Sequence, residues 1–374
     1  MKKIGIVTII DYTNYGNRLQ NYAVQEVLKS LGCKVETLVY ETIKENKNES
    51  RIASFIEKLR RNTPKKIIIS IEERIKKRML MKLLESKRLK FKQFTKKHIL
   101  ETRFLISDEL ENEVVNQFNY FVVGSDQVWN PFFRKGSPID FLTFAQKNKR
   151  IAYAPSFAVS SIPSEYINVY SSWISDMAYL SVREDSGAKI IKQLTGRDAI
   201  VLVDPTLMLS REKWLSIATS AVNKPKQRYL LTYFIGNLSN ARRKKIKSIA
   251  IKNDLEIVNL CSLKDKERYI TDPGEFIDYI NSASIFLTDS FHGTIFSILL
   301  EKPFVIFDRE EKIQSMNSRI DTLLSKFKLE SRKEDNIDLK GSIFEMDYLH
   351  IPLILEAERK KTIDYLNIAL DLMI

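Results

Sequence analysis

Residues 285–296 read IFLTDSFHGTIF and join a short apolar run directly to a stretch with helical spacing. The run 285–288 predicts a buried strand, and the polar residues after it form the turn into a helix. Short apolar runs alternate with helical stretches along most of the chain, which is typical of βα units and parallel sheets. The alternation restarts after Asp204-Pro205, so the sequence predicts two sheets in an α/β fold.

The predicted domains follow from this alternation. The first spans residues 1–205 and contains a helical insertion at 45–105, and the second spans residues 206–350. A last helix within residues 351–374 carries an apolar stripe suited to packing back on the first domain. Ligands of open α/β sheets bind at the carboxyl ends of the strands, so a cleft between the two domains is the expected site.

The composition excludes several classes of protein. Hydrophobic residues make up 44% and charged residues 29% of the 374 residues, as in globular proteins, and no apolar run approaches the roughly 18 residues that span a bilayer. Two cysteines and three histidines are too few for a disulfide framework or a zinc cluster, so no metal is expected. The glycines form neither the dinucleotide-binding nor the P-loop pattern. The N-terminal segment MKKIGIVTII predicts a strand of a cytoplasmic protein rather than a signal peptide.

The net charge of +13 lies in one segment. Residues 51–100 contain 17 Lys and Arg against 4 Asp and Glu, and the rest of the chain is balanced. Apolar residues recur here three and four positions apart, which predicts a basic amphipathic helix: Ile68, Ile71, Ile75, Met79 and Leu83. Two interpretations stay open, a stripe that packs on its own domain and a surface for an anionic membrane. Nucleic acid is not the expected partner, because no known binding motif and no aromatic platform accompany the charges.

Two polar turns follow predicted strands of the first domain. Asn14, Asn17 and Gln20 lie after the first strand, and amides suit bidentate hydrogen bonds to sugar hydroxyls. Ordinary capping of the next helix is the alternative for this turn. The second turn follows the strand predicted at 120–123 and combines polar groups with an aromatic ring that can stack on a sugar: Ser125, Asp126, Gln127, Trp129 and Asn130. A place in the hydrophobic core is the alternative for the tryptophan.

Two further turns contain groups that bind anions. Arg183 can hold a phosphate or carboxylate bidentately, or it can pair with a carboxylate of the chain itself: Glu184, Asp185 or Asp204. In the opening stretch, the helix N-terminus offers N–H groups to an anion, and Ser290 and Thr294 add hydroxyls. His292 is the one histidine of three in such a turn and is the candidate general acid or base, with a purely structural role as the alternative.

In order and spacing these turns resemble the polysaccharide pyruvyltransferase family. The resemblance covers nearly the whole chain apart from the insertion, and its segments are specific in combination: Asp11–Gln20, Val123–Asn130, Ala154–Phe157, Ser181–Ser186, Val203–Thr206, Asp289–Gly293, Lys302-Pro303 and Met316–Arg319. Many members have an arginine-leucine pair before the histidine, whereas this chain has Ser290-Phe291. The function of that arginine would fall to another one: Arg183, Arg309 or Arg319.

The resemblance implies a GT-B-like protein of two Rossmann-like domains. It implies a transferase that moves pyruvate from phosphoenolpyruvate to a sugar diol as a cyclic ketal, in capsule or exopolysaccharide biosynthesis. Phosphoenolpyruvate would be a co-substrate, no cofactor is implied, and the acceptor would be a sugar or a lipid-linked oligosaccharide. The location would be cytoplasmic, at the inner face of the membrane if the insertion binds lipid.

The resemblance also assigns roles to the residues of the four turns. His292 and Asp126 are the expected catalytic residues. Donor binding is expected from Arg183, Ser290, His292, Gly293, Thr294 and Arg319. Acceptor binding is expected from Asn14, Asn17, Gln20, Ser125, Gln127, Trp129 and Asn130.

Two other functions stay open on the sequence. A GT-B glycosyltransferase that uses a nucleotide sugar would have the same fold and could use the same histidine and arginine. A non-enzymatic module would bind a membrane or nucleic acid through the insertion, with the α/β body as a scaffold. Polar turns after so many strands favour an enzyme over a scaffold.

Overall fold

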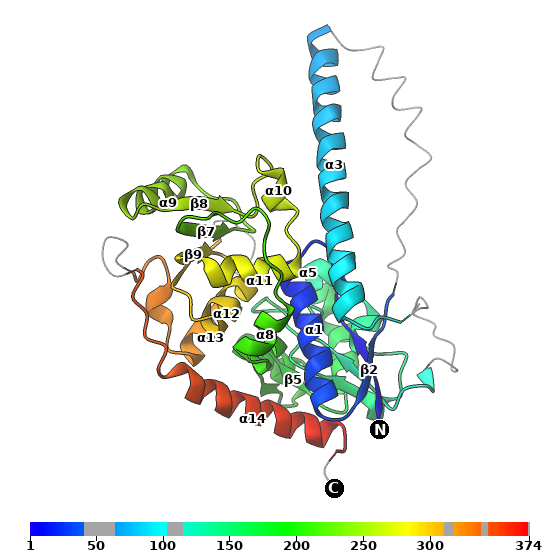
Figure 1. Ribbon diagram of the computed structural model, residues 1–374. Helices are drawn as coiled ribbons and strands as arrows, with labels where there is room; N and C mark the ends of the chain where they lie inside the picture. Colours follow the sequence, from blue (N-terminus) through cyan, green and yellow to red (C-terminus); the bar gives the residue numbers. More distant parts are fainter. Residues whose placement is uncertain (41–63, 103–114, 310–317, 338–342, 373–374) are drawn as a thin grey trace.

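Two parallel sheets form the body of the protein in the computed structural model (Figure 1). Each sheet is flanked by helices, so the predicted α/β class with two Rossmann-like units is confirmed. Side chains of the insertion are described from Lys77 onward, and the structure as a whole describes residues 1–40, 64–102, 115–309, 318–337 and 343–372.

The first sheet has the strand order β2-β1-β3-β4, and all its neighbours are parallel. A short parallel pair, β5 and β6, continues it through a bridge between Ile151 and Tyr179. Apolar residues occupy both faces of the inner strands, which is why these strands read as apolar runs rather than as alternating patterns. The strands are β1 (Lys3–Val7), β2 (Lys34–Thr37), β3 (Tyr120–Val123), β4 (Arg150–Ala152), β5 (Ser181–Val182) and β6 (Ile200–Val201).

The second sheet has the order β10-β9-β7-β8 and is also parallel. Its strands are β7 (Tyr229–Tyr233), β8 (Glu256–Asn259), β9 (Ile285–Thr288) and β10 (Phe304–Ile306). The helices are α1 (Tyr15–Ser30), α3 (Pro64–His98), α5 (Pro131–Arg134), α6 (Ile167–Ser175), α7 (Asp185–Thr195), α8 (Arg211–Ile217), α9 (Asn240–Lys252), α10 (Lys266–Tyr269), α11 (Pro273–Ser282), α12 (Phe291–Leu299), α13 (Ser318–Lys326) and α14 (Ile351–Ala369).

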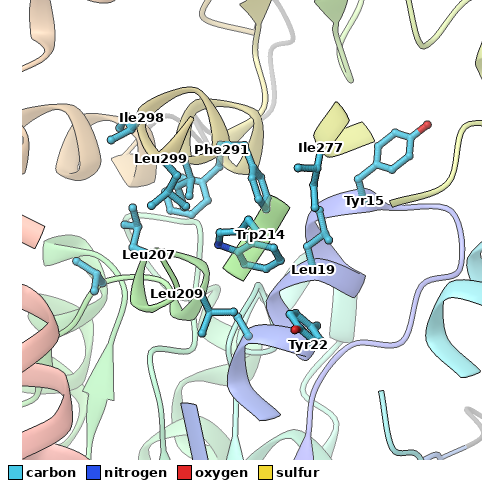
Figure 2. Packing of buried hydrophobic residues seen from close by; sticks show 14 of the residues in the cluster. Tyr15, Leu19, Tyr22, Leu207, Leu209, Trp214, Ile277, Phe291, Ile298 and Leu299 are labelled. Atoms are coloured by element: carbon cyan, nitrogen blue, oxygen red, sulfur yellow. The ribbon is translucent and has the colours of Figure 1, made fainter. Parts of the chain in front are cut away.

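One hydrophobic core connects the two units (Figure 2). Tyr15 of α1 stacks on Phe276 of α11 with ring centroids 4.3 Å apart. Two turns later on α1, Tyr22 packs on Trp214 of α8, which also contacts Phe296 of α12. Helix α1 therefore packs on both its own sheet and the second unit, which fixes the first polar turn against the helices of the second sheet.

Two long helices, α3 and α14, lie at the outside of this body (Figure 1). Helix α14 contacts the first unit, where the Tyr365 hydroxyl donates to the Ala152 carbonyl at 2.6 Å. Helix α3 lies within the insertion predicted at 45–105. Residues 45–63 and 103–105 of the predicted insertion lie outside the described residues. No helix in the described ranges combines the length and apolarity needed to cross a bilayer. The limits of the domains, near residues 205 and 350, stay a prediction.

Candidate functional site

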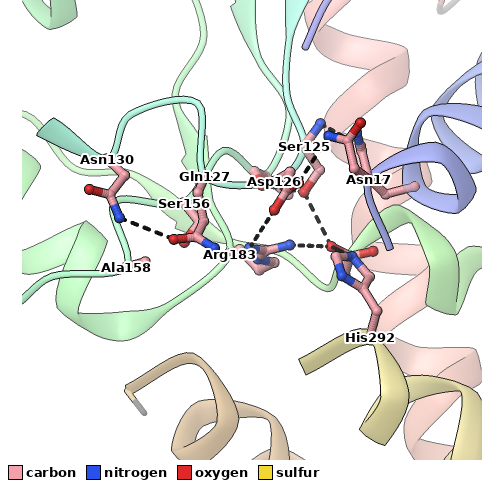
Figure 3. Close-up of polar contacts among 12 residues, drawn as sticks. Asn17, Ser125, Asp126, Gln127, Asn130, Ser156, Ala158, Arg183 and His292 are labelled. Carbon is pink, nitrogen blue, oxygen red and sulfur yellow. Dashed lines mark hydrogen bonds and ion pairs between the residues drawn. The ribbon is translucent and has the colours of Figure 1, made fainter. Parts of the chain in front are cut away.

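The polar turns after β1, β3, β5 and β9 meet at one place between the two units (Figure 3). At its centre lies Asp204, which is only 1% exposed. Its Oδ2 lies 2.5 Å from Nη1 of Arg183 and 3.5 Å from Nε2 of His292. The Ser125 hydroxyl is 3.3 Å from the same oxygen. Asp204 therefore joins the arginine of the first unit to the histidine of the second.

The Asp204 carboxylate is held ionised by its neighbours. Burial by itself would raise its pKa, because a charge is costly in a low-dielectric interior. The attraction of His292 and then of Arg183 outweighs this cost, and the Thr206 hydroxyl adds a hydrogen bond of 2.6 Å. The pKa of Asp204 therefore lies well below its usual range, and its negative charge is fixed beside the histidine ring.

Two buried arginines lie close to the ring of Phe291. The guanidinium carbon of Arg183 is 4.4 Å from the ring centroid, and that of Arg319, from α13, is 5.4 Å away. Burial and the nearby Arg183 lower the pKa of Arg319 to about 9. Both guanidinium groups have nitrogens without a hydrogen-bond partner: Arg183 Nε and Nη2, and Arg319 Nε. Two buried cations with donors to spare form a place suited to an anion.

Two serines close in sequence to these arginines also have buried hydroxyls. The hydroxyls of Ser186 and Ser318 are buried without a hydrogen-bond partner. Arg309, the third candidate for the missing arginine, lies 3.4 Å from the Asp289 carboxylate. Arg309 is thus already paired with a carboxylate, whereas Arg319 has no carboxylate within salt-bridge distance among the described residues.

Helix α12 begins with Ser290 as its N-cap, and the predicted donor-binding hydroxyls are engaged within this helix start. The Ser290 Oγ accepts a hydrogen bond from the Gly293 N–H at 3.2 Å. The Thr294 hydroxyl donates to the Ser290 carbonyl at 3.0 Å, and Thr294 is fully buried. The expectation that Thr294 contacts a ligand therefore does not fit this structure, because its hydroxyl faces the preceding turn.

His292 rests against the backbone of α1. A Cβ added to Gly16 would lie 2.0 Å from Nδ1 of His292, so no side chain fits at position 16. The absence of a side chain at Gly16 therefore allows a close approach between the two units. The other ring nitrogen, Nε2, faces Asp204 and makes no hydrogen bond in this structure.

The Gly16 contact leads to a prediction about stability. We expect Gly16→Ala to lower the free energy of unfolding by about 1–3 kcal/mol, because the methyl group must displace the histidine ring or the helix. Urea titration monitored by circular dichroism measures the change. Gly187→Ala in α7 is the matched control, since its added Cβ would meet nothing nearer than 3.2 Å. Equal stability of the two variants would contradict the close approach.

Part of the predicted acceptor side forms a buried hydrogen-bond framework. The Asn17 amide donates to Asp126 Oδ2 at 3.1 Å, and Asp126 Oδ1 lies 3.7 Å from Arg183 Nη2. Gln20 donates to the Thr8 hydroxyl and accepts from the Ser125 N–H. Asn14 caps α1 through the Asn17 N–H. Gln20 and Asn17 are buried, so they position the turn rather than face solvent.

Trp129 differs from the expectation of a sugar-stacking ring. It is 0% exposed, its ring stacks on Phe141 at 5.4 Å, and its indole N–H donates to the Asp140 carbonyl at 2.8 Å. Both faces of the ring are covered, so the core alternative holds. Asn130 caps α5 through the Phe132 N–H and donates to Gln127, whose side chain is half-buried beside the site (Figure 3).

Sequence reasoning missed Asp204 as a functional residue and considered it only as a possible partner of Arg183. It also missed Glu184, whose Oε1 accepts from the Ser156 hydroxyl and from the N–H groups of Phe157 and Ala158. Its Oε2 is buried without a partner. Asp204 immediately follows the apolar run 201–203, and this signal was present in the sequence. In the described part of the chain, no group of three or more His, Cys, Asp or Glu side chains is arranged to hold a metal ion.

The chain is similar to several solved structures at low sequence identity. Solved structures that are similar include a putative UDP-N-acetylglucosamine 2-epimerase from Listeria monocytogenes, with 11% identity, a TM-score of 0.48, and coverage of 98% of this chain and 90% of that one. Another is the UDP-GlcNAc 2-epimerase from Neisseria meningitidis, bound to UDP-GlcNAc, with 10% identity, a TM-score of 0.45, and coverage of 97% and 94%. Arabidopsis thaliana UGT89C1, complexed with UDP-L-rhamnose, has 10% identity, a TM-score of 0.45, and coverage of 98% and 95%.

The family comparison is the decisive one. No curated protein matches the chain significantly. The model of the family described as polysaccharide pyruvyl transferase matches residues 14–311, a stretch that contains all four polar turns, Asp204 and the whole second sheet. Because this match covers most of the chain, the protein belongs to the polysaccharide pyruvyl transferase family.

Proposed function

We propose that this protein transfers pyruvate from phosphoenolpyruvate to two hydroxyls of a sugar, which leaves a cyclic ketal and inorganic phosphate. The observation that carries the proposal is the pair Arg183 and Arg319, both buried and both with guanidinium nitrogens that lack a partner. Asp204 pairs with Arg183, whereas Arg319 has no carboxylate within salt-bridge distance among the described residues, so its buried charge is costly unless an anion joins it. Phosphoenolpyruvate supplies two anionic groups, a phosphate and a carboxylate, on a three-carbon frame.

The donor would bind across Phe291, with one anionic group at each arginine. Guanidinium groups bind phosphate and carboxylate through two parallel hydrogen bonds, which fixes the orientation as well as the affinity. The unpartnered hydroxyls of Ser186 and Ser318 add donors on the same side. This arrangement would place the reacting carbons of the donor next to His292.

The proposed reaction forms two C–O bonds and breaks one. Protonation of the methylene carbon makes C2 electrophilic, and a sugar hydroxyl adds there as it loses its proton. Phosphate then leaves, and the second hydroxyl attacks C2 and loses its proton, which closes the ketal ring. His292 would transfer one of these protons, with the fixed charge of Asp204 stabilising the imidazolium that forms. Asp126 is the second candidate base and lies between Asn17 and Arg183.

The acceptor would approach from the first unit. Gln127 and Asn14 are the half-buried members of the predicted acceptor set, whereas Gln20, Ser125 and Trp129 are buried. The proposed acceptor is a sugar, free or part of a lipid-linked oligosaccharide, in the biosynthesis of a capsule or exopolysaccharide. The proposed location is the cytoplasm, where a lipid-linked acceptor would lie at the inner face of the membrane. The scheme uses phosphoenolpyruvate as co-substrate and needs no cofactor.

Thermal unfolding in the presence of donor candidates tests the donor class. A ligand that binds the folded state at about 100 times its Kd stabilises it by about 2.7 kcal/mol. We expect phosphoenolpyruvate to raise the melting temperature and UDP-sugars to leave it unchanged. A shift with a UDP-sugar and none with phosphoenolpyruvate would favour a nucleotide-sugar glycosyltransferase instead.

Replacement of Arg183 by lysine should damage donor binding although the charge is kept. Lysine cannot form the two parallel hydrogen bonds of a guanidinium, and its single ammonium would remain beside Asp204. We expect the KM for phosphoenolpyruvate to rise about tenfold or more, with the KM for the acceptor nearly unchanged. Steady-state phosphate release at varied donor concentration measures both constants. A change in the acceptor KM alone would place Arg183 on the other side of the site.

A further inference from the structure

Helix α3 is fixed to the second unit by its C-terminal half. The Lys87 ammonium lies over three aromatic rings, 4.5 Å from the centroid of Tyr15, 4.9 Å from Tyr269 and 5.6 Å from Phe91. Burial lowers the pKa of Lys87 to about 8. Lys90 forms an ion pair of 3.0 Å with Glu275 at the start of α11. These contacts hold the preceding turns of α3 beside the segment that leads into α10 (Figure 1).

A groove of about 660 Å³ lies between these two segments. Helix α3 and the segment before α10 both contribute apolar and basic side chains to it, and its lining contains no carboxylate among the described residues: Lys77, Met79, Leu80, Lys82, Leu83, Ser86, Leu263 and Lys266. Met79 is 48% exposed and Leu263 is 50% exposed. Met81, also on α3, is 55% exposed. Apolar side chains are thus open to solvent between lysines.

We propose that this groove, defined by Lys77, Met79, Lys82, Leu263 and Lys266, docks on a membrane that contains anionic phospholipid. The apolar floor would take up the acyl region of a lipid, and the lysines at its edge would meet the phosphate groups. The sequence pointed to α3 alone, whereas the groove requires Leu263 and Lys266 of the second unit as well. The inference goes beyond the proposed reaction, because docking needs no turnover.

The chemistry of the lining favours a lipid surface over other anionic partners. Long apolar side chains next to lysines match the boundary between acyl chains and head groups. Each basic residue near an anionic membrane contributes about 1 kcal/mol, and this attraction is screened by salt. Among the described residues, no aromatic side chain lines the groove, so bases of a nucleic acid would find nothing there on which to stack.

Vesicle sedimentation with the full chain tests the proposal. We expect binding to phosphatidylcholine vesicles that contain phosphatidylglycerol, weaker binding at high salt, and little binding to pure phosphatidylcholine. Lys266→Glu should weaken binding about tenfold, and so should Leu263→Asp, which removes apolar contact and adds a negative charge. Lys189→Glu in α7 and Leu353→Asp in α14 are matched controls on exposed residues outside the groove and should bind like the parent.

Three outcomes would overturn the proposal. One is the absence of any preference for anionic vesicles at low salt. Another is equal weakening by Lys189→Glu and Lys266→Glu, which would mean that net charge rather than the groove determines binding. The third is that the parent binds duplex DNA but no vesicles, and that Lys266→Glu weakens the DNA binding. Circular dichroism of each variant checks that the fold is intact, and Leu263→Ser replaces Leu263→Asp if the latter unfolds.

Discussion

Replacement of His292 by alanine should lower kcat by at least about 100-fold while the fold remains intact. Removal of a general acid or base typically costs 10²–10⁴ in rate. His292 is the histidine at the meeting point of both units, with Nε2 3.5 Å from Asp204 and close to Arg183, which contacts the same carboxylate. Phosphate release from phosphoenolpyruvate in the presence of acceptor measures the effect.

A second histidine variant separates an effect on catalysis from an effect on folding. His350→Ala is the matched control, because His350 lies before α14, where its Nε2 contacts the Phe327 carbonyl at 2.8 Å, and it takes no part in the proposed site. His292→Ala should still show a thermal shift with phosphoenolpyruvate, since the two arginines remain. Unchanged turnover in His292→Ala would contradict the catalytic role, and unfolding would assign the ring a structural role against Gly16.

Asp204→Asn should have the second large effect, on both stability and activity. The substitution keeps the shape of the side chain but leaves Arg183 buried without its closest counter-charge. Loss of one partner of a buried ion pair costs about 3–5 kcal/mol. The proton transfer at His292 should also slow, because the imidazolium loses the adjacent negative charge.

The pH dependence of this variant has a defined sign. The folded-state pKa of Asp204 lies below the unfolded value of about 3.9, so its ionised form adds stability that is present above about pH 4 and lost as the pH falls below it. The difference in unfolding free energy between the parent and Asp204→Asn should therefore shrink between pH 7 and pH 3. Urea titrations at several pH values measure it.

The control for Asp204→Asn is Asp198→Asn. Asp198 pairs with Lys192 at 2.9 Å, but its side chain is 88% exposed, and surface pairs contribute about 0–1 kcal/mol. A loss of stability in Asp204→Asn no greater than in this control would contradict the account of Asp204 as the charge that joins the two units.

The sequence predicted a site in a cleft between the two domains, because ligands of open α/β sheets bind at the carboxyl ends of the strands. Strands of a parallel sheet place their carboxyl ends at one edge, so residues that follow β1, β3 and β5 had to lie near one another. The family resemblance then implied that Arg183 binds the donor and that His292 is catalytic and binds the donor. The sequence did not show that a shared carboxylate lies between Arg183 and His292, since Asp204 follows β6 at the edge of the sheet.

The roles of individual side chains were harder to predict, because exposure depends on tertiary neighbours. Trp129 has the aromatic ring of a sugar-stacking residue. Its ring is nevertheless buried, because Phe141 stacks on it and the Asp140 carbonyl accepts its indole N–H. The Gln20 amide donates to the Thr8 hydroxyl and accepts from the Ser125 N–H, so it is already satisfied within the first unit. The close approach of Gly16 to His292 joins residues that are far apart in sequence, and no local pattern marks it.

The most direct test of the central claim is a single incubation of the protein with phosphoenolpyruvate, UDP-sugars and a panel of free and lipid-linked oligosaccharides. Phosphate release and the mass of the acceptor are both followed. The account predicts that phosphate appears only when an acceptor is present, and that each phosphate is matched by one acceptor that has gained a pyruvate ketal. An acceptor that gains a sugar from a nucleotide sugar, with phosphoenolpyruvate left intact, would contradict it.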